Sequence, residues 1–427
     1  MNVTILPGPR TGAVQIPSSK SIAHRALICA ALAEQSTEIG CRGISADIEA
    51  TMNCLEGLGA GFEVEGRRIL VTPVKDKSGI LQDTPLVLPC RESGSTLRFL
   101  LPLTGALGRA SVFVMEGRLS QRPMQPYETL LQEHGMTIRR TGKELSCKGQ
   151  LTPGIYSLPG NISSQYFSGL LFSLPLLDGD SRIVIEGALE SADYLALTEQ
   201  MIRRFGIRLE KAPDGYRIFG GQRYLIPENP QEISVEGDYS SAAFFLCAGA
   251  FSKEGIRAGN LSPHSAQGDR RILEVLQRFG AVVLVEQDTV FVKKGALTGI
   301  DIDASMIPDL IPVLCVVAAA AEGTTRVYHA QRLRMKESDR IESTCSMLKS
   351  LGAEITETPD GMIIQGTGQL EGGAVIDPCQ DHRIAMSSAV AAGICRKEVV
   401  IQNAECAAKS YPDFWRDLQS LNLTDQS

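Results

Sequence analysis

A repeated pattern of helix, glycine and hairpin constrains the fold of this chain more than any other feature of its sequence. Five amphipathic stretches are each closed by a glycine, at Gly59, Gly135, Gly206, Gly280 and Gly352, with spacings of 76, 71, 74 and 72 residues. Glycine directly after a helix favours the left-handed conformation that ends the helix. Alternating apolar residues follow each glycine and indicate a strand. Five such signals at near-equal spacing predict an α/β protein built from structural repeats.

A sixth copy of the repeat is incomplete. It has an apolar strand at 399–402 and a helix at 411–421, but no hairpin follows the helix. The apolar segment 2–6 is a spare strand at the N-terminus, and we expect it to complete the sixth copy. Three copies in each half then give a discontinuous first domain, residues 1–18 and 236–427, and an inserted second domain, residues 19–235. The segment 227–230, with two prolines and an asparagine, has the composition of a linker between them.

Six polar clusters each open a long run of small and apolar residues. They are Ser19-Lys20-Ser21, Ser93-Gly94-Ser95-Thr96, Ser163-Ser164-Gln165, Asp238-Tyr239-Ser240-Ser241, Pro308-Asp309 and Asp381-His382-Arg383. Ser, Thr and Asp at such positions are typical of helix caps, and Asp309 fits either a cap or a proton acceptor for a bound hydroxyl. A helix start also offers free N–H groups and about half a positive charge. Six starts that face one place would bind small polyanions.

Cationic side chains accompany these helix starts and the loops of the repeats. They are Lys20, Arg25, Arg98, Arg122, Lys336, Arg340, Arg383 and Lys409. Taken alone, each is equally well a solvated charge or part of a cap. The charged loop 334–340, however, occupies the same place in its repeat as Arg122, Ser191 and Lys409 do in theirs. Eight cations in one cleft repel one another, so we expect two anionic ligands and a cleft that closes when they bind.

Composition excludes several classes of function. The net charge of −7 argues against bulk binding to nucleic acid or an anionic membrane, and a single Trp with 5% aromatic residues disfavours base-stacking platforms. No signal peptide is visible, and the apolar runs are too short to span a bilayer. The eleven cysteines form no CxxC pair and no metal-ligand spacing appears. We therefore expect a cytoplasmic monomer that acts on small molecules, without nucleic acid or membrane partners.

Ten stretches of the sequence, read in order, resemble the 5-enolpyruvylshikimate-3-phosphate synthase family of enolpyruvyl transferases. They are SSKSIAHRAL, ESGSTLR, QRPM, NISSQYFSGLL, EGDYSSAAFF, QGDRR, IPDLIP, RMKESDR, DHRIAM and AAKSYPDF, and they run from residue 18 to residue 414. The resemblance implies a fold of two domains, each of three βαβαββ units, with the active site in the cleft between them. It implies no metal and no organic cofactor.

The resemblance also implies a reaction, in which shikimate 3-phosphate and phosphoenolpyruvate give the 5-enolpyruvyl ether and phosphate through a tetrahedral intermediate. This is the sixth step of the shikimate pathway to chorismate and aromatic amino acids, and the family suggests inhibition by glyphosate. The implied catalytic residues are Lys20, Asp309 and Glu337. The implied shikimate 3-phosphate ligands are Lys20, Ser21, Arg25, Ser163, Ser164, Gln165, Ser191, Tyr194, Asp309 and Lys336. The implied phosphoenolpyruvate ligands are Lys20, Gly94, Arg122, Arg340, Arg383 and Lys409, with Arg98 in support.

Two other functions fit parts of the pattern. UDP-N-acetylglucosamine 1-carboxyvinyltransferase shares the fold and the donor substrate. Resemblance to that family would imply a nucleophilic Cys in the loop before the Arg-Pro pair, and the corresponding loop 116–122 here has none. A catalytically silent anion-binding scaffold would lack Lys20, Asp309 or Glu337, and all three are present. The chain departs from the family pattern at Ser18 and Glu92, where Gly and Asn are usual. Glu92 brings a negative charge near an anion pocket, unless Arg91 or Arg98 pairs with it.

Overall fold

A computed structural model describes residues 1–75, 84–226 and 233–424 of the chain. The chain divides into two compact units. Unit 1 consists of Met1–Ser19 with Glu236–Ser427, and unit 2 consists of Lys20–Val235. This division differs from the boundaries predicted from the sequence only in the assignment of Ser19. The predicted linker at 227–230 lies outside the described residues.

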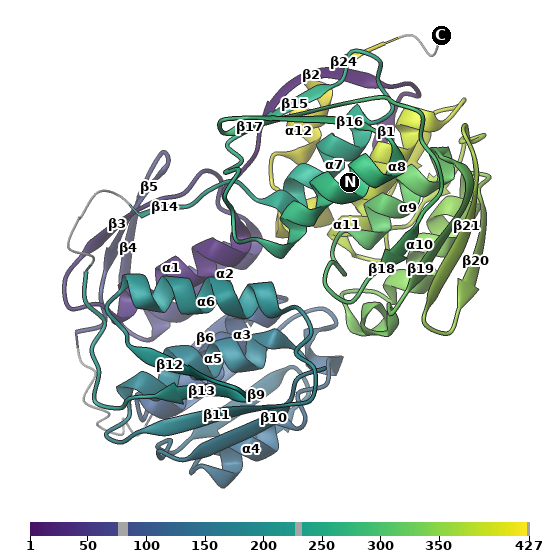
Figure 1. Ribbon diagram of the computed structural model, residues 1–427. Coiled ribbons are helices and arrows are strands. Elements are labelled where there is room, and N and C mark those ends of the chain that lie inside the picture. Colours follow the sequence, from purple (N-terminus) through teal and green to yellow (C-terminus); the bar gives the residue numbers. More distant parts are fainter. Residues whose placement is uncertain (76–83, 227–232, 425–427) are drawn as a thin grey trace. The chain divides into compact units, whose positions relative to one another are not determined.

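Unit 2 contains three copies of the repeat (Figure 1). The first copy comprises α1 (Lys20–Leu32), β3 (Thr37–Gly40), α2 (Ala46–Gly57), β4 (Gly61–Glu65), β5 (Arg68–Thr72) and, from the end of the unit, β14 (Ile233–Ser234). The second comprises β6 (Leu86–Arg91), α3 (Gly94–Ala106), β7 (Ser111–Met115), α4 (Tyr127–Glu133), β8 (Thr137–Thr141) and β9 (Glu144–Lys148). The third comprises β10 (Ile155–Pro159), α5 (Ser164–Ser173), β11 (Ser181–Glu186), α6 (Ala192–Arg204), β12 (Leu209–Ala212) and β13 (Gly215–Ile218).

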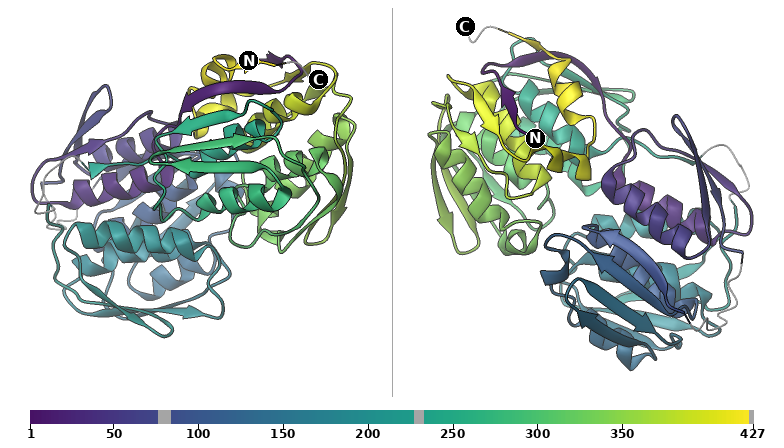
Figure 2. Two further views of the ribbon diagram at one scale, coloured as in Figure 1. Left: turned by 45° about the horizontal axis from the view of Figure 1, so that its top comes forward. Right: turned by 180° about the vertical axis from the view of Figure 1, so that it is seen from behind.

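Unit 1 contains the other three copies and both terminal segments of the chain (Figure 2). The first comprises β2 (Arg10–Gln15), α7 (Tyr239–Gly249), β15 (Ile256–Gly259), α8 (Ile272–Phe279), β16 (Val282–Glu286) and β17 (Thr289–Lys293). The second comprises β18 (Asp301–Asp303), α9 (Ile311–Ala320), β19 (Glu322–Tyr328), α10 (Arg340–Ser350), β20 (Glu354–Thr358) and β21 (Gly361–Thr367). The third comprises β22 (Val375–Ile376), α11 (His382–Ala391), β23 (Val399–Ile401) and α12 (Phe414–Gln419).

One strand order recurs in the described sheets. In the order β6-β7-β9-β8, the first two strands are parallel and the hairpin joins antiparallel through its second strand. The same order holds for β10-β11-β13-β12, β14-β3-β5-β4 and β18-β19-β21-β20, and for β2-β15-β17-β16, to which β24 (Asn422–Leu423) is added. The sixth sheet is β22-β23-β1, where β1 (Val3–Ile5) pairs antiparallel with β23. The prediction that the N-terminal segment completes the sixth copy is therefore confirmed.

The first helix of each repeat forms the core of its unit. In α9, for example, nine of the ten residues are buried, because a helix that is apolar on all sides must be surrounded. The ribbons of Figure 1 show α7, α9 and α11 inside unit 1, and α3 and α5 inside unit 2, with strands outside them. The five glycines that define the repeat all have positive φ, between 80° and 102°, which confirms the predicted helix ends.

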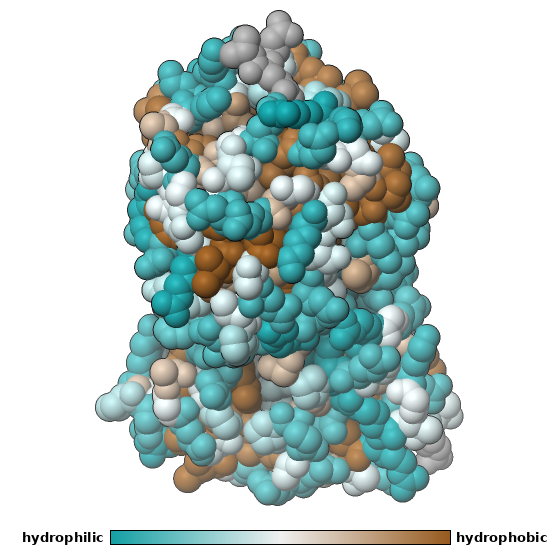
Figure 3. Space-filling view, turned by 90° about the vertical axis from the view of Figure 1, so that its right-hand side faces the viewer, coloured by the Kyte–Doolittle hydropathy of each residue, from teal (hydrophilic) through white to brown (hydrophobic). Residues whose placement is uncertain are grey.

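The face of the molecule in Figure 3 is mostly hydrophilic, with smaller apolar patches between the polar side chains. Each unit has its own buried hydrophobic cluster beneath such a surface. Among the described helices, we find none that combines the length and the apolar character that a membrane span requires.

Candidate active site

The predicted site residues fall into two groups, one in each unit, and each group is described separately. Four of the six polar clusters cap their helices as expected. Ser93, Ser163, Asp238 and Asp381 are the N-cap residues of α3, α5, α7 and α11, and each side chain accepts a hydrogen bond from a backbone N–H of the first turn. Asp309 is different. The N-cap of α9 is Leu310, which makes no side-chain cap bond, so of the two interpretations of Asp309 the helix cap was wrong.

In unit 1, the Asp309 carboxylate accepts hydrogen bonds from three cationic side chains instead. Its Oδ1 accepts from Lys336 Nζ at 3.3 Å and from Arg340 Nη1 at 2.8 Å. Its Oδ2 accepts from Arg383 Nη2 at 3.1 Å, and the backbone carbonyl of Asp309 accepts from Nη1 of the same arginine at 3.0 Å. The structure therefore brings together four of the residues predicted from the sequence, from the turn before α9, the loop before α10, the start of α10 and the start of α11.

These contacts set the protonation of the two most exposed members of the group. Burial by itself raises the pKa of Asp309, but the charges of Arg383, Lys336 and Arg340 outweigh it and hold the pKa well below its usual range. Burial lowers the pKa of Lys336 to about 8, although the Asp309 carboxylate partly opposes that effect. At neutral pH, Asp309 is therefore ionised, and Lys336 is mostly protonated but loses its proton at a lower pH than an ordinary lysine.

Arg340 pairs with three carboxylates of this group, one of which is Asp309. Its side chain is only 1% exposed, and it also pairs with Glu337, at 2.8 Å from Nη2 to Oε2, and with Asp381, at 2.8 Å from Nε to Oδ2. The other oxygen of Glu337 lies 3.8 Å from Lys409 Nζ. Asp381 is fully buried and also accepts from Ser338 Oγ at 3.0 Å. We refer to Asp309, Lys336, Glu337, Arg340, Asp381 and Arg383 as the Asp309 cluster.

Two carboxylates of unit 1 were not predicted as site residues. Asp381 fixes Arg340 while it caps α11, and its position at a helix start was the available signal. Asp269 is 2% exposed and accepts a hydrogen bond from Ser240 Oγ. Burial, together with the charge of Asp309, raises the pKa of Asp269 to about 7, against the opposing charge of Arg383. Nothing in the spacing of the QGDRR stretch indicated this environment.

In unit 2, Gln165 links the starts of two buried helices. Its Nε2 donates to Ser95 Oγ at 2.8 Å, and its Oε1 accepts from Arg98 Nη1 at 2.6 Å. The Gly94 backbone lies beside two guanidinium groups, because a Cβ added there would be 3.1 Å from Arg122 Nη1 and 3.4 Å from Arg98 Nη1. A side chain here would displace the Arg122 guanidinium by a few tenths of an ångström, so glycine admits these cations at the start of α3 without displacement.

Two cations at α1 have different environments. Lys20, the first residue of α1, pairs with Asp47 at 2.9 Å from Nζ to Oδ2, a partner that was not predicted. Arg25 is 2% exposed, and all three of its guanidinium nitrogens donate to protein atoms. The acceptors are Thr198 Oγ1 at 2.7 Å, the Ser21 carbonyl at 2.6 Å, the Tyr194 carbonyl at 2.8 Å and Ser168 Oγ at 3.4 Å. Arg25 therefore positions Ser21 and Tyr194 in this structure.

The remaining predicted residues of unit 2 lie at helix starts. Ser163 and Ser164 are the N-cap and first residue of α5, and Ser191 precedes α6 in a left-handed conformation, with φ of 55° and 3% exposure. Glu92 lies against Gly117, where an added Cβ would overlap its Oε1. Of the two pairings considered for Glu92, Arg91 binds Glu49 at 2.6 Å, and Arg98 Nη1 donates to Gln165.

A family model described as EPSP synthase (3-phosphoshikimate 1-carboxyvinyltransferase) matches residues 6–418 of this chain. The chain belongs to the EPSP synthase family. It is similar to 3-phosphoshikimate 1-carboxyvinyltransferase from Clostridium perfringens, with 43% identity over 426 residues and 98% coverage of both chains. It is also 42% identical to the protein of the same name from Clostridium acetobutylicum, over 98% of this chain and 97% of that protein.

Solved structures agree with this membership of the EPSP synthase family. EPSP synthase from Acinetobacter baumannii superposes with a TM-score of 0.81 at 27% identity, covering 99% of this chain and all of that chain. The enolpyruvyl transferase NikO from Streptomyces tendae has a TM-score of 0.78 at 18% identity, over 99% of this chain and 98% of that one, which shows a shared fold. The two-domain α/β fold predicted from the repeats is confirmed, and the alternative sugar-nucleotide enzyme is not favoured.

Proposed function

We propose that this chain transfers the enolpyruvyl group of phosphoenolpyruvate to the 5-hydroxyl of shikimate 3-phosphate and releases phosphate. The observation that carries the proposal is the Asp309 cluster, in which one ionised carboxylate is shared by Lys336, Arg340 and Arg383. A family match over residues 6–418 supports the same reaction. Both substrates are multiply charged anions. Their phosphate and carboxylate groups can replace the Asp309 carboxylate as the partner of the cations in this cluster.

The reaction needs groups that move two protons and stabilise developing charge. The 5-hydroxyl oxygen attacks C2 of phosphoenolpyruvate and loses its proton, while the methylene carbon gains one, which gives a tetrahedral intermediate. That carbon then returns a proton as the bond to phosphate breaks. In our proposal, Asp309 accepts the hydroxyl proton, and Glu337 or Lys20 donates a proton to the methylene carbon and later takes one back. Preorganised cations stabilise the leaving phosphate.

The contacts of Asp309 suggest how its basicity is controlled. Three cations around the carboxylate keep its pKa low, so it is a weak base in this arrangement. We assign Arg340 and Arg383 to phosphoenolpyruvate. A bound phosphoenolpyruvate that recruits these two arginines would withdraw their charge from Asp309 and strengthen it as a base. The donor substrate would thus activate the group that deprotonates the acceptor.

In unit 2, the same proposal assigns shikimate 3-phosphate to the helix starts of α1 and α5. Ser163 and Ser164 present hydroxyls and backbone N–H groups at the start of α5, where an anion is favoured by the helix dipole. Gln165 is held by Ser95 and Arg98, which fixes the direction of its amide. Lys20 is assigned to both substrates, as a flexible point charge.

A two-substrate turnover assay with identification of the product tests the function. Phosphate release that requires both shikimate 3-phosphate and phosphoenolpyruvate, with the enolpyruvyl ether as product, is the expected result. Release with UDP-N-acetylglucosamine in place of shikimate 3-phosphate would instead indicate the related sugar-nucleotide enzyme. Absence of release with either acceptor would leave an anion-binding scaffold. The expected inhibition by glyphosate is tested in the same assay, by competition against phosphoenolpyruvate.

We also propose that the protein works in the cytoplasm. All eleven cysteines lie in the described part of the chain, where each is a free thiol and nine are buried. Free cysteines are usual where glutathione and thioredoxin keep thiols reduced. Fractionation of cells that express the chain with a small epitope tag, followed by detection of the tag, is the corresponding test.

A further inference from the structure

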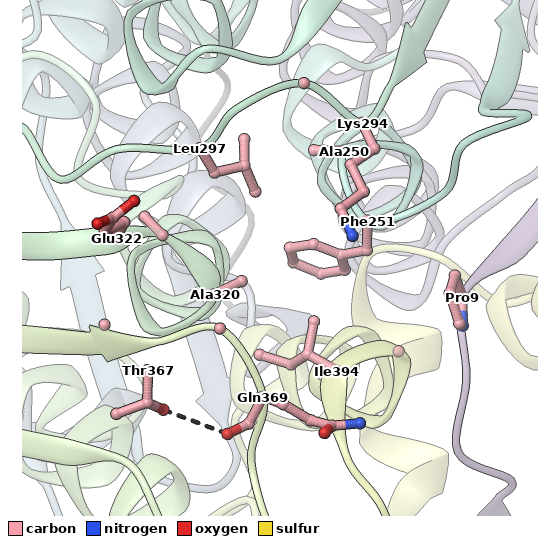
Figure 4. A pocket seen from close by; sticks show the side chains of 15 residues that line it. Pro9, Ala250, Phe251, Lys294, Leu297, Ala320, Glu322, Thr367, Gln369 and Ile394 are labelled. Carbon is pink, nitrogen blue, oxygen red and sulfur yellow. Dashed lines mark hydrogen bonds between the residues drawn. The ribbon is translucent and has the colours of Figure 1, made fainter. Parts of the chain in front are cut away.

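Unit 1 contains a pocket of about 500 Å³ at the C-terminal ends of α7, α9 and α11 (Figure 4). Its lining includes Ala250 at the end of α7, Ala320 and Ala321 at the end of α9, and Ile394 just after α11. The Asp309 cluster lies at the opposite, N-terminal ends of α9 and α11. Ten helical residues span roughly 15 Å, so the pocket is separate from that cluster.

The sequence explains why this end of unit 1 is hollow. The residue directly after each of the three buried helices is an alanine, namely Ala250, Ala321 and Ala392. At the same position after α3 and α5 in unit 2 stand Leu107 and Leu174, which are both buried. Ala250 and Ala321 line the pocket, and their short side chains leave space that a leucine would fill.

Unit 2 also shows which group fits at such a place. There, α1 is followed by Ala33, and Tyr224 pairs with Ala33 through a backbone bridge. The Tyr224 ring is fully buried, and its hydroxyl donates to the carbonyl of Phe172 at 2.9 Å, near the end of α5. A phenol ring thus occupies the helix ends of unit 2, with its donor directed at a helix-terminal carbonyl.

The lining of the pocket has the matching chemistry. Phe251 and Ile394 are buried, at 5% and 7% exposure, and Figure 4 shows both directed with Leu297 toward a common space. The C-terminal ends of helices present carbonyl groups and partial negative charge, which favour a hydrogen-bond donor. Lys294 is exposed at the edge and offers a cation to an anionic group. Glu322, the other charged residue of the lining, lies on the far side from Lys294 (Figure 4).

We propose that this pocket binds a small phenol that carries a carboxylate. The ring lies against Phe251 and Ile394, the hydroxyl donates to carbonyls at the helix ends, and the carboxylate meets Lys294. The volume is within the range of small-molecule pockets. This orientation keeps the anion away from the negative ends of the helices. The site does not depend on the proposed transferase activity, because it shares no residue with the Asp309 cluster.

Titration of the full-length protein with 3-(4-hydroxyphenyl)propionate, followed by ligand-observed NMR, tests the proposal. We expect saturable binding that excess phosphoenolpyruvate and shikimate 3-phosphate do not displace. The analogue without the hydroxyl, 3-phenylpropionate, should bind about 5-fold more weakly, since one neutral hydrogen bond is lost. Tyramine, which replaces the carboxylate with an ammonium, should also bind more weakly. Equal or tighter binding of tyramine, or displacement of the probe by the two substrates, would overturn the assignment.

Three variants and a matched control locate the probe. Ala321→Leu introduces the residue type that follows α3 and α5, and it should abolish saturable binding in a variant that still unfolds cooperatively. If that variant does not fold, Ala320→Leu, at the partly exposed end of α9, provides the same block. Lys294→Met should weaken binding about 5-fold, as expected for an exposed charge pair. Lys293→Met, in the last position of β17 and outside the pocket lining, is the matched control and should change nothing. Absence of saturable binding to the unmodified protein, or binding that survives both the filling and the Lys294 substitutions, contradicts the proposal.

Discussion

Arg383 holds Asp309 through two groups at once: Nη1 donates to the Asp309 backbone carbonyl at 3.0 Å and Nη2 donates to Oδ2 at 3.1 Å. The two residues are 74 positions apart in the sequence. Their contact joins the turn before α9 to the first turn of α11 and orients the carboxylate toward Lys336 and Arg340. Asp309 therefore has two roles. It neutralises three cations in this structure and, in our proposal, it accepts the proton of the substrate hydroxyl.

Substitution of Asp309 separates these two roles. We expect Asp309→Ala to lower kcat by about 10²–10⁴-fold, because a positioned base is lost. Binding of phosphoenolpyruvate should be retained or tightened, because Lys336, Arg340 and Arg383 lose this carboxylate partner and can bind the anion instead. Steady-state kinetics and equilibrium titration measure the two effects. Asp301→Ala, at an exposed position of β18, is the control and should be neutral. A variant that keeps most of its turnover would refute the catalytic role.

Titration of Lys336 gives a pH dependence. Its pKa of about 8 means that the ammonium is present below pH 8 and is lost as the pH rises. The Asp309 cluster then has one positive charge fewer, so the KM of the anionic substrates should increase from pH 7 to pH 9. Lys336→Arg, which stays charged throughout, should remove this increase. Kinetics over this pH range provide the check, and an identical profile in the variant would assign the titration to another group.

A side chain at position 94 should weaken the binding of phosphoenolpyruvate, the donor substrate. The added Cβ in Gly94→Ala would stand 3.1 Å from Arg122 Nη1, which is close enough to displace the guanidinium by a few tenths of an ångström. Small displacements of a positioning arginine are costly, so we expect the KM of phosphoenolpyruvate to rise about 10-fold, with a smaller change for shikimate 3-phosphate. Gly61→Ala in β4, where the added Cβ meets Thr72 at an ordinary 3.4 Å, is the control. Equal changes for both substrates would contradict a specific role of Arg122.

Arg25 should prove important for stability as well as for any ligand. Its guanidinium makes four hydrogen bonds to protein atoms inside unit 2, which connect α1 with α5 and α6. We expect Arg25→Ala to lower the free energy of unfolding by about 2–4 kcal/mol, because buried acceptors lose a charged donor. Urea denaturation measures this loss, with Arg204→Ala on the exposed face of α6 as the control. Unchanged stability with impaired substrate binding would show that Arg25 acts only as a ligand.

Much of the fold was available from local sequence signals. The closing glycines, the polar residues at helix starts and the spare N-terminal strand all depend on residues that are neighbours in the chain, and the structure confirms them at Gly59, Ser93, Ser163 and β1. Such signals are readable because backbone conformation and capping are decided within a few residues. The family was readable for a related reason, since the motifs at these helix starts occur in a fixed order.

The sequence by itself therefore determined the repeat, the helix ends closed by glycine and the family of this protein, whereas the helix predicted at 411–421 is shorter in the structure, Phe414–Gln419. The tertiary structure alone decided which charges meet. It showed that Asp309 binds three cations and does not cap α9, that Asp47 pairs with Lys20, and that the nitrogens of Arg25 are directed into unit 2. The physical reason is that periodicity and capping are local, whereas an ion pair between residues 74 positions apart depends on how buried helices pack and on how much water that packing removes.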